Sequence, residues 1–134
     1  MVKYIPGDLV TIETESMKPR VVKVSNVDEN SVINCEGWGE VCFYEEIKPI
    51  PLTKDILLRN GWKVSRDSLL LKIDDNATLG VVFAFEHKVC YIRATNDIIH
   101  KEQCFARLKL SDVDFVSDLQ HILSIFHLNS EMEV

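Results

Sequence analysis

The sequence predicts an α+β protein, with an N-terminal SH3-like small β-barrel in residues 1–48 followed by an antiparallel or mixed sheet that a C-terminal helix covers. Three observations support this class. Short strand signals crowd into residues 8–47, a capped helix follows two prolines at positions 49 and 51, and an apolar stripe with helical spacing lies near the end of the chain. A chain of 134 residues has room for one core or two small ones. We place the domain boundary between residues 48 and 49.

The N-terminal block is predicted to consist of short strands. Val10 and Ile12, like Val22 and Val24, repeat at every second position, which is the pattern of half-buried strands. Segments rich in turn-forming residues separate the strand signals. The expected strands cover residues 9–14, 20–27, 31–35 and 40–44. So many short strands in so few residues favour a small barrel.

Residues 53–60 are predicted to form a short helix with two defined ends. Thr53 is a good N-cap residue because its hydroxyl can accept a backbone N–H of the first turn. At the other end, Gly61 can adopt the left-handed conformation of a Schellman motif, which brings Trp62 back toward Leu57. This helix therefore opens the second block, residues 49–134.

Several short motifs near this helix and near the C-terminus occur together in the chain: Ile50-Pro51-Leu52-Thr53, Ile56-Leu57, Asn60-Gly61-Trp62, Val116 and Leu119-Gln120. The set resembles a family of short uncharacterised proteins from gut anaerobic bacteria and their phages or mobile elements, which carry an IPLT…NGF segment and a C-terminal LQ helix. This chain has Ser117 where the family usually has histidine, and Trp62 where it has phenylalanine. The resemblance implies a bacterial origin and an architecture, but no reaction.

The second block is predicted to add strands within residues 62–110 and then a long helix. The expected strands are 62–64, 68–73, 79–85, 88–93 and 105–110. Residues 81–85 are apolar on both faces, so we expect them in a central strand.

A long helix is predicted over residues 112–127. Ser111 and Asp112 resemble a helix start, and apolar residues then recur at helical spacing with Leu119 at the middle of the stripe. We expect this helix to cover the sheet of the second block. Ser117 is expected on its exposed side.

No pattern of reactive side chains predicts a catalytic, cofactor or metal site. The four cysteines, Cys35, Cys42, Cys90 and Cys104, have no C-x-x-C spacing and are expected to be buried, reduced thiols. His100 and Cys104 lie four residues apart, and His121 and His127 lie on the last helix, but these spacings are not those of ligand pairs. We therefore predict no bound metal and no cofactor.

Trp38 and Tyr44 are the predicted interaction surface. Trp38 stands between two glycines at an expected hairpin tip, and small barrels often bind through aromatic loop residues. The alternative for both aromatic side chains is packing between the two blocks.

The charge balance bears on the class of partner. Residues 1–50 hold 5 basic and 9 acidic side chains, which give −4 of the total charge of −6. Both halves are thus acidic, so nucleic acid is not favoured. No apolar stretch is long enough for a membrane span. We expect a cytoplasmic, non-enzymatic binding or accessory module with a protein partner. The alternatives are a phage- or mobile-element-associated regulator that contacts nucleic acid through the barrel, and an enzyme with an unrecognised site.

Overall fold

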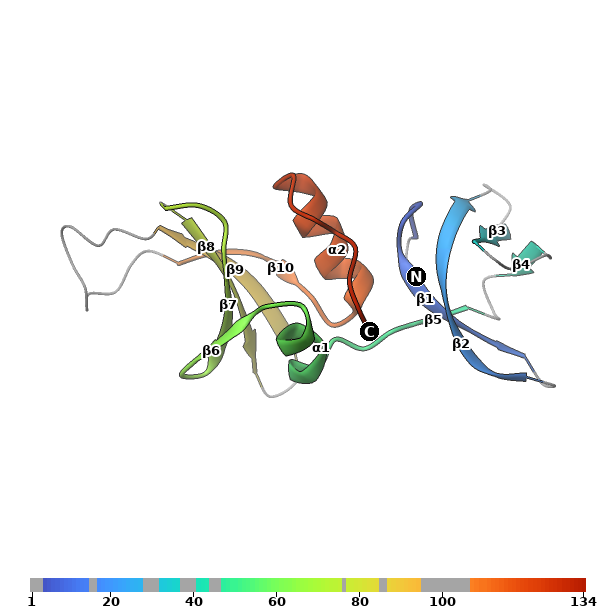
Figure 1. Ribbon diagram of the computed structural model, residues 1–134, viewed down its shortest axis with the longest axis horizontal. Helices are drawn as coiled ribbons and strands as arrows, with labels where there is room; N and C mark the ends of the chain where they lie inside the picture. The colour runs from blue at the N-terminus through green and yellow to red at the C-terminus, as the bar shows by residue number, and fades with distance from the viewer. Residues whose placement is uncertain are drawn as a thin grey trace. The chain divides into compact units, whose positions relative to one another are not determined.

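The computed structural model places the chain in two compact units (Figure 1). The first unit contains Met1–Pro51 and Phe115–Met132, and the second contains Leu52–Asp114 and Glu133–Val134. The structure describes residues 4–14, 17–27, 32–36, 41–43, 47–75, 77–84, 87–94 and 107–134.

The first unit is an antiparallel sheet with one helix. Its elements are β1 (Leu9–Thr14), β2 (Met17–Val27), β3 (Val32–Cys35), β4 (Val41–Phe43), β5 (Ile47–Pro49) and α2 (Val116–Ile125). Strands β2, β1 and β5 pair side by side, and β3 and β4 extend this sheet to the order β4-β3-β2-β1-β5.

The described strands of the first unit do not form a closed barrel. Closure would need the two outer strands, β4 and β5, to pair with each other. Their partners in the described part of the chain are β3 and β1 instead. The structure therefore shows an α+β fold with an open sheet at the N-terminus, and the SH3-like barrel stays a prediction.

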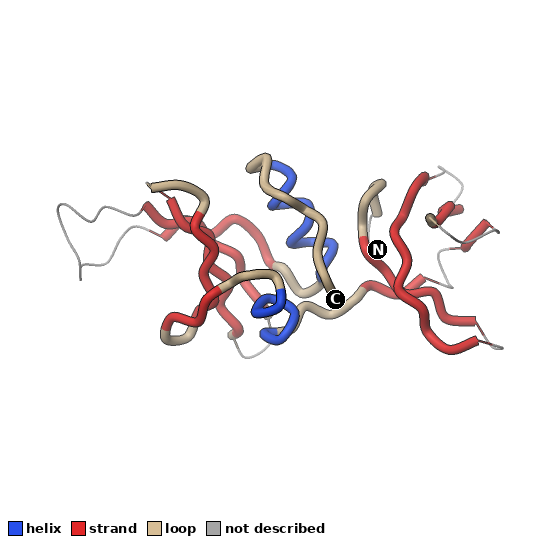
Figure 2. The backbone as a smooth tube through the Cα atoms, in the orientation of Figure 1, coloured by secondary structure: helices blue, strands red, loops and turns tan. Residues whose placement is uncertain are grey.

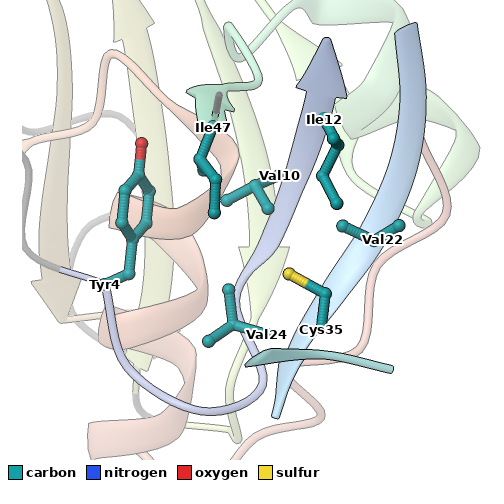
Figure 3. Packing of buried hydrophobic residues seen from close by; sticks show 7 residues of the cluster. All are labelled: Tyr4, Val10, Ile12, Val22, Val24, Cys35 and Ile47. Carbon is teal, nitrogen blue, oxygen red and sulfur yellow. The ribbon is translucent and has the colours of Figure 1, made fainter. Parts of the chain in front are cut away.

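Alternating apolar residues of the first three strands build the core of the first unit. Figure 3 shows Val10 and Ile12 of β1 beside Val22 and Val24 of β2, all at most 5% exposed. Val21, between the two β2 positions, is 46% exposed. The two-residue period predicted for these strands is thus confirmed.

The second unit is a five-stranded antiparallel sheet in which each strand pairs with the next along the chain (Figure 2). Its elements are α1 (Lys54–Arg59), β6 (Lys63–Ser65), β7 (Ser68–Lys72), β8 (Ala77–Phe83), β9 (Lys88–Ala94) and β10 (Arg107–Asp112). The order β10-β9-β8-β7-β6 puts β8 at the centre, as the apolar segment predicted. The sheet is antiparallel throughout, so the mixed alternative is excluded.

Helix α1 has both of its predicted ends. The Thr53 hydroxyl accepts the Ile56 N–H at 3.2 Å. Gly61 has φ +87°, and the Trp62 N–H donates to the Leu57 carbonyl at 3.1 Å, which is the long hydrogen bond of a Schellman motif. These local hydrogen bonds stabilise a helix of only six residues.

Helix α2 begins four residues later than predicted. Ser111 and Asp112 do not cap a helix, because they pair with β9 as the end of β10. The helix starts after Phe115, whose N–H donates to the Asp118 carboxylate at 3.1 Å. Ser117 is 1% exposed, so its predicted exposure was wrong, whereas Leu119 is fully buried as predicted.

The unit to which α2 belongs differs from the predicted division of the chain into residues 1–48 and 49–134. The helix was expected to cover the sheet of the second block, residues 49–134, but it belongs to the same compact unit as β1–β5. One reason is the backbone before it: the Val116 N–H donates to the Ile50 carbonyl at 2.8 Å, and Pro51 forms a β-bridge with Phe115. The helix is thereby tied to the chain that leaves β5.

Candidate functional site

The predicted interaction surface falls outside the part of the chain that the structure describes. Neither Trp38 nor Tyr44 is among the described residues, and the same holds for His100 and Cys104. Their roles stay predictions. Two arrangements of described side chains are the candidates for a functional site, one in each unit.

The candidate in the first unit is built on Gln120, a side chain of α2 that is only 4% exposed. Its Oε1 accepts the Leu9 N–H at 2.9 Å, and its Nε2 donates to the carbonyls of Gly7 at 3.1 Å and Ser130 at 2.9 Å. One carboxamide therefore joins the start of β1, the helix and the segment after the helix.

An acid–imidazole pair lies beside this carboxamide in sequence. The Asp8 carboxylate is buried, and both of its oxygens lie within 2.8 and 3.0 Å of His121 Nε2. One oxygen also accepts the Ile5 N–H at 3.0 Å. The His121 side chain is 30% exposed, so solvent reaches the imidazole but not the carboxylate.

This cluster lacks the geometry of a nucleophilic site. Ser117 precedes His121 by one helical turn, and a serine nucleophile would need a hydrogen bond to the imidazole and access to a substrate. The Ser117 Oγ is buried and has no hydrogen-bond partner among the described residues. We therefore assign Asp8, Gln120 and His121 a structural role, in which they fix α2 to the start of β1. We call these three residues the polar clamp.

The candidate in the second unit is one face of its sheet. Directly paired residues lie on the same face, so Tyr91 shares a face with Gly80, Leu70 and Lys63 on one side and with Lys109 on the other. Positions two residues away along each strand add to this face. The described members are Lys63, Ser65, Ser68, Leu70, Lys72, Thr78, Gly80, Val82, Val89, Tyr91, Arg93, Lys109 and Asp112, and we call this surface the Tyr91 face.

The opposite face of the sheet belongs to the core. Leu69, Leu79, Val81 and Cys90 point to that side, and each is at most 2% exposed. The ammonium group of Lys54, in α1, lies 5.6 Å from the ring centroid of Phe83 on the same face. This face thus carries the fully buried aliphatic side chains of the sheet, with Lys88 as the direct partner of Phe83, and the Tyr91 face carries basic side chains from four strands.

The Tyr91 face holds four basic side chains from four strands. Lys63, Lys72 and Lys109 are exposed, and Arg93 is half-buried. With strands about 4.8 Å apart and a rise of about 3.4 Å per residue, neighbouring members of this set lie about 8–10 Å apart at the backbone. Together they form an arc of positive charge across the sheet.

Two lysines of the arc form exposed ion pairs with acidic residues close to them in sequence. Asp75 lies 3.3 Å from the Lys72 ammonium, and Asp112 lies 3.3 Å from that of Lys109. All four side chains are more than half exposed. Pairs of this kind contribute about 1 kcal/mol or less, so a ligand carboxylate or phosphate can replace them at small cost.

The floor of the Tyr91 face is closed by Tyr91 itself. The ring lies over Gly80, where a Cβ atom would come within 2.3 Å of the tyrosine Cζ. The Tyr91 hydroxyl donates to Ser68 Oγ at 3.0 Å, and Ser68 in turn donates to the Asp67 carboxylate at 3.1 Å. This chain of hydrogen bonds fixes the ring flat on the sheet.

The buried cysteines agree with the sequence. Cys35 and Cys90 are buried and form no disulfide, as predicted. Burial raises the pKa of the Cys90 thiol from 9.0 to about 12, which keeps it neutral and unreactive. The side chains of Cys42 and Cys104 lie outside the described set.

The described residues contain neither a metal-binding cluster nor a helix that could cross a membrane. No group of three or more His, Cys, Asp or Glu side chains is placed to hold a metal ion in the described part of the chain. None of the described helices is long and apolar enough to cross a membrane. Comparison with protein-family models, with curated proteins and with solved structures found no match for the chain.

Proposed function

We propose that the protein is a non-enzymatic binding or accessory module, and that the Tyr91 face is the surface that holds its anionic partner. The observation that supports this proposal is the set of four basic side chains from four strands on one sheet face. A rigid sheet keeps these charges at defined spacings, so less conformational entropy is lost on binding than with a flexible basic tail.

An enzyme is supported less well by the described residues. Asp8 and His121 are the described pair most suited to proton transfer, and Asp8 is buried with its oxygens occupied by a backbone N–H and the imidazole. The imidazole would be the base of such a pair, and the Ser117 hydroxyl one helical turn before it is buried, so it cannot act as the nucleophile. The polar clamp therefore favours a role in folding over a role in chemistry.

A regulator that contacts nucleic acid through the N-terminal strands is the second candidate. The arc of basic residues lies in the second unit, on β6, β7, β9 and β10, and not on those strands. The resemblance to short proteins of gut bacteria and phages is compatible with either kind of module. We rank the protein-binding module first.

The experiment that tests the proposal is binding to a polyanion. Fluorescein-labelled polyglutamate is titrated at low salt with the full chain and with the variant Lys63→Glu/Lys109→Glu. Both lysines are exposed, so the variant should keep the fold. We expect the charge reversal to lower the affinity about tenfold or more, since it removes two of the four cations and adds two like charges.

A control variant with the same change in net charge distinguishes an effect of the Tyr91 face from an effect of the total charge of the chain. Lys18→Glu/Lys48→Glu places the same charges on exposed positions of β2 and β5 in the first unit. The proposal predicts little change for this variant. Equal losses for the two double variants would show that the Tyr91 face is not the binding surface.

A further inference from the structure

We infer that the partner bound by the Tyr91 face is an acidic segment of another protein that also presents aliphatic side chains; this inference rests on the proposed function. The face combines two kinds of surface. Besides the basic arc it carries Leu70, Val82 and Val89, all half-buried. A ligand that matches both parts needs carboxylates and apolar groups together.

The aliphatic residues form one strip. Val82 of β8 and Val89 of β9 are direct cross-strand partners, and Leu70 of β7 lies one row further along the sheet. Direct partners on one face have Cβ atoms about 5 Å apart. The strip therefore offers aliphatic surface on three neighbouring strands, with Lys63 and Lys109 at the ends of the row that contains Leu70.

Nucleic acid fits this face less well than an acidic peptide. Single strands are held by stacking of bases on exposed aromatic rings along with phosphate contacts. Tyr91 is 4% exposed, lies flat over Gly80 and uses its hydroxyl on Ser68, so its ring offers no stacking platform.

The two-part surface predicts a specific salt response. Contacts between carboxylates and exposed lysines weaken as salt is added, because counterions screen them. Contacts with the aliphatic strip do not weaken in this way. An acidic and apolar ligand should therefore keep part of its affinity at physiological salt, whereas a purely acidic ligand should lose nearly all of it.

Three probes of similar negative charge test the inference by fluorescence anisotropy on the full chain. The first is a short peptide of glutamate and leucine, the second is the same peptide with each leucine replaced by glutamine, and the third is oligothymidylate. We expect the leucine peptide to bind about tenfold tighter than the glutamine peptide, because about 1.4 kcal/mol of apolar contact corresponds to that ratio.

A matched variant assigns the preference to the strip. Val82→Thr/Val89→Thr keeps the side-chain shape and the strand propensity while adding two hydroxyls. We expect this variant to bind the two peptides equally, with the affinity for the glutamine peptide unchanged. Urea unfolding of each variant verifies that the fold is retained.

The outcomes separate the inference from the function on which it rests. If the two peptides bind the unmodified chain equally and Lys63→Glu/Lys109→Glu lowers both affinities, the inference is overturned, but the Tyr91 face remains the binding surface. Tighter binding of oligothymidylate, lost in the same variant, would replace the partner class by nucleic acid. Failure of all three probes to bind, or binding that the charge reversal leaves intact, would overturn the proposed function itself.

Discussion

Both units contain buried polar side chains that form hydrogen bonds, but the sequence separation between the bonded residues differs greatly between the two units. In the first unit, Gln120 bonds Leu9 across 111 positions, and His121 contacts Asp8 across 113. In the second, Tyr91 bonds Ser68 across 23, between strands of one continuous meander. The first unit therefore depends on polar contacts between its two chain segments, whereas the sheet of the second pairs strands that follow one another in sequence. Substitutions in both units break or sharpen this contrast.

The largest effect is expected for Gln120→Met. Methionine keeps the length of the side chain but can neither accept from Leu9 nor donate to Gly7 and Ser130, and each buried group left unpaired costs about 1–3 kcal/mol. We expect a loss of roughly 3 kcal/mol or more in the free energy of unfolding, measured with urea. Ile125→Met, on the 73% exposed side of the same helix, is the control and should change little.

Gln120→Glu tests the two donor contacts. Glutamate can still accept the Leu9 N–H, but its buried carboxylate would face the Gly7 and Ser130 carbonyl oxygens, so we expect a loss about as large as that of Gln120→Met. If Gln120→Met were as mild as Ile125→Met, the polar clamp would not hold the first unit together.

Gly80→Ala is expected to cost about 1–3 kcal/mol, because the new methyl group would overlap the Tyr91 ring. The reason can be isolated in a double-mutant cycle with Tyr91→Ala. In that background, Gly80→Ala should be neutral or stabilising, since alanine loses less backbone entropy on folding than glycine. Additive losses would show that the ring does not limit this position.

Cys90 is expected to make the second unit sensitive to alkali. A raised pKa in the folded state means that the unfolded chain loses the thiol proton first, from pH 9 upward. The thiol's contribution to stability is therefore complete below pH 9 and is lost as the pH rises toward about 12. The unmodified chain should lose up to about 1.4 kcal/mol per pH unit more than Cys90→Ala in this range. Parallel urea melts over pH 8–11 measure the difference, and superimposable pH profiles would contradict it.

The smallest effect concerns the two helix ends. Helix α2 closes with the same hydrogen bond as α1, from the Leu128 N–H to the Leu123 carbonyl at 2.9 Å, but its left-handed residue is His127, with φ +57°, and not glycine. His127→Gly should stabilise by up to about 1 kcal/mol, because glycine adopts this conformation without steric cost. The reverse change at α1, Gly61→Ala, should destabilise by a similar amount, and thermal melts compare the two.

Local patterns were sufficient for part of this fold. The capping of α1 by Thr53 and Gly61, the alternation in β1 and β2 and the central place of β8 all follow from residues close together in sequence. The start of α2 was missed because Ser111 and Asp112 pair with β9, and that pairing depends on strand register. The polar clamp joins residues more than a hundred positions apart, which no local pattern reveals.

The Tyr91 face could not be predicted from the sequence for a related reason. Lys63, Lys72, Arg93 and Lys109 stand on separate strands among more numerous acidic residues, so composition shows only an acidic chain. That they share a face can be recognised only from the register of four strand pairs. Alternation offered one signal: Lys72 stands two positions after Leu70, and Arg93 two positions after Tyr91, so each pair shares a face of its strand.

The interruption of the first unit by the second sets an order of events during synthesis. Strands β1–β5 leave the ribosome well before α2, because residues 52–114 are made in between. Protein domains usually complete their folding in the order in which they emerge. Here the unit that starts first must finish last: until residues 120 and 121 appear, the Leu9 N–H lacks the Gln120 carboxamide and the Asp8 carboxylate lacks the His121 imidazole. A nascent chain arrested before residue 115 would therefore carry strands β1–β5 without helix α2, together with a second unit that lacks only residues 133 and 134.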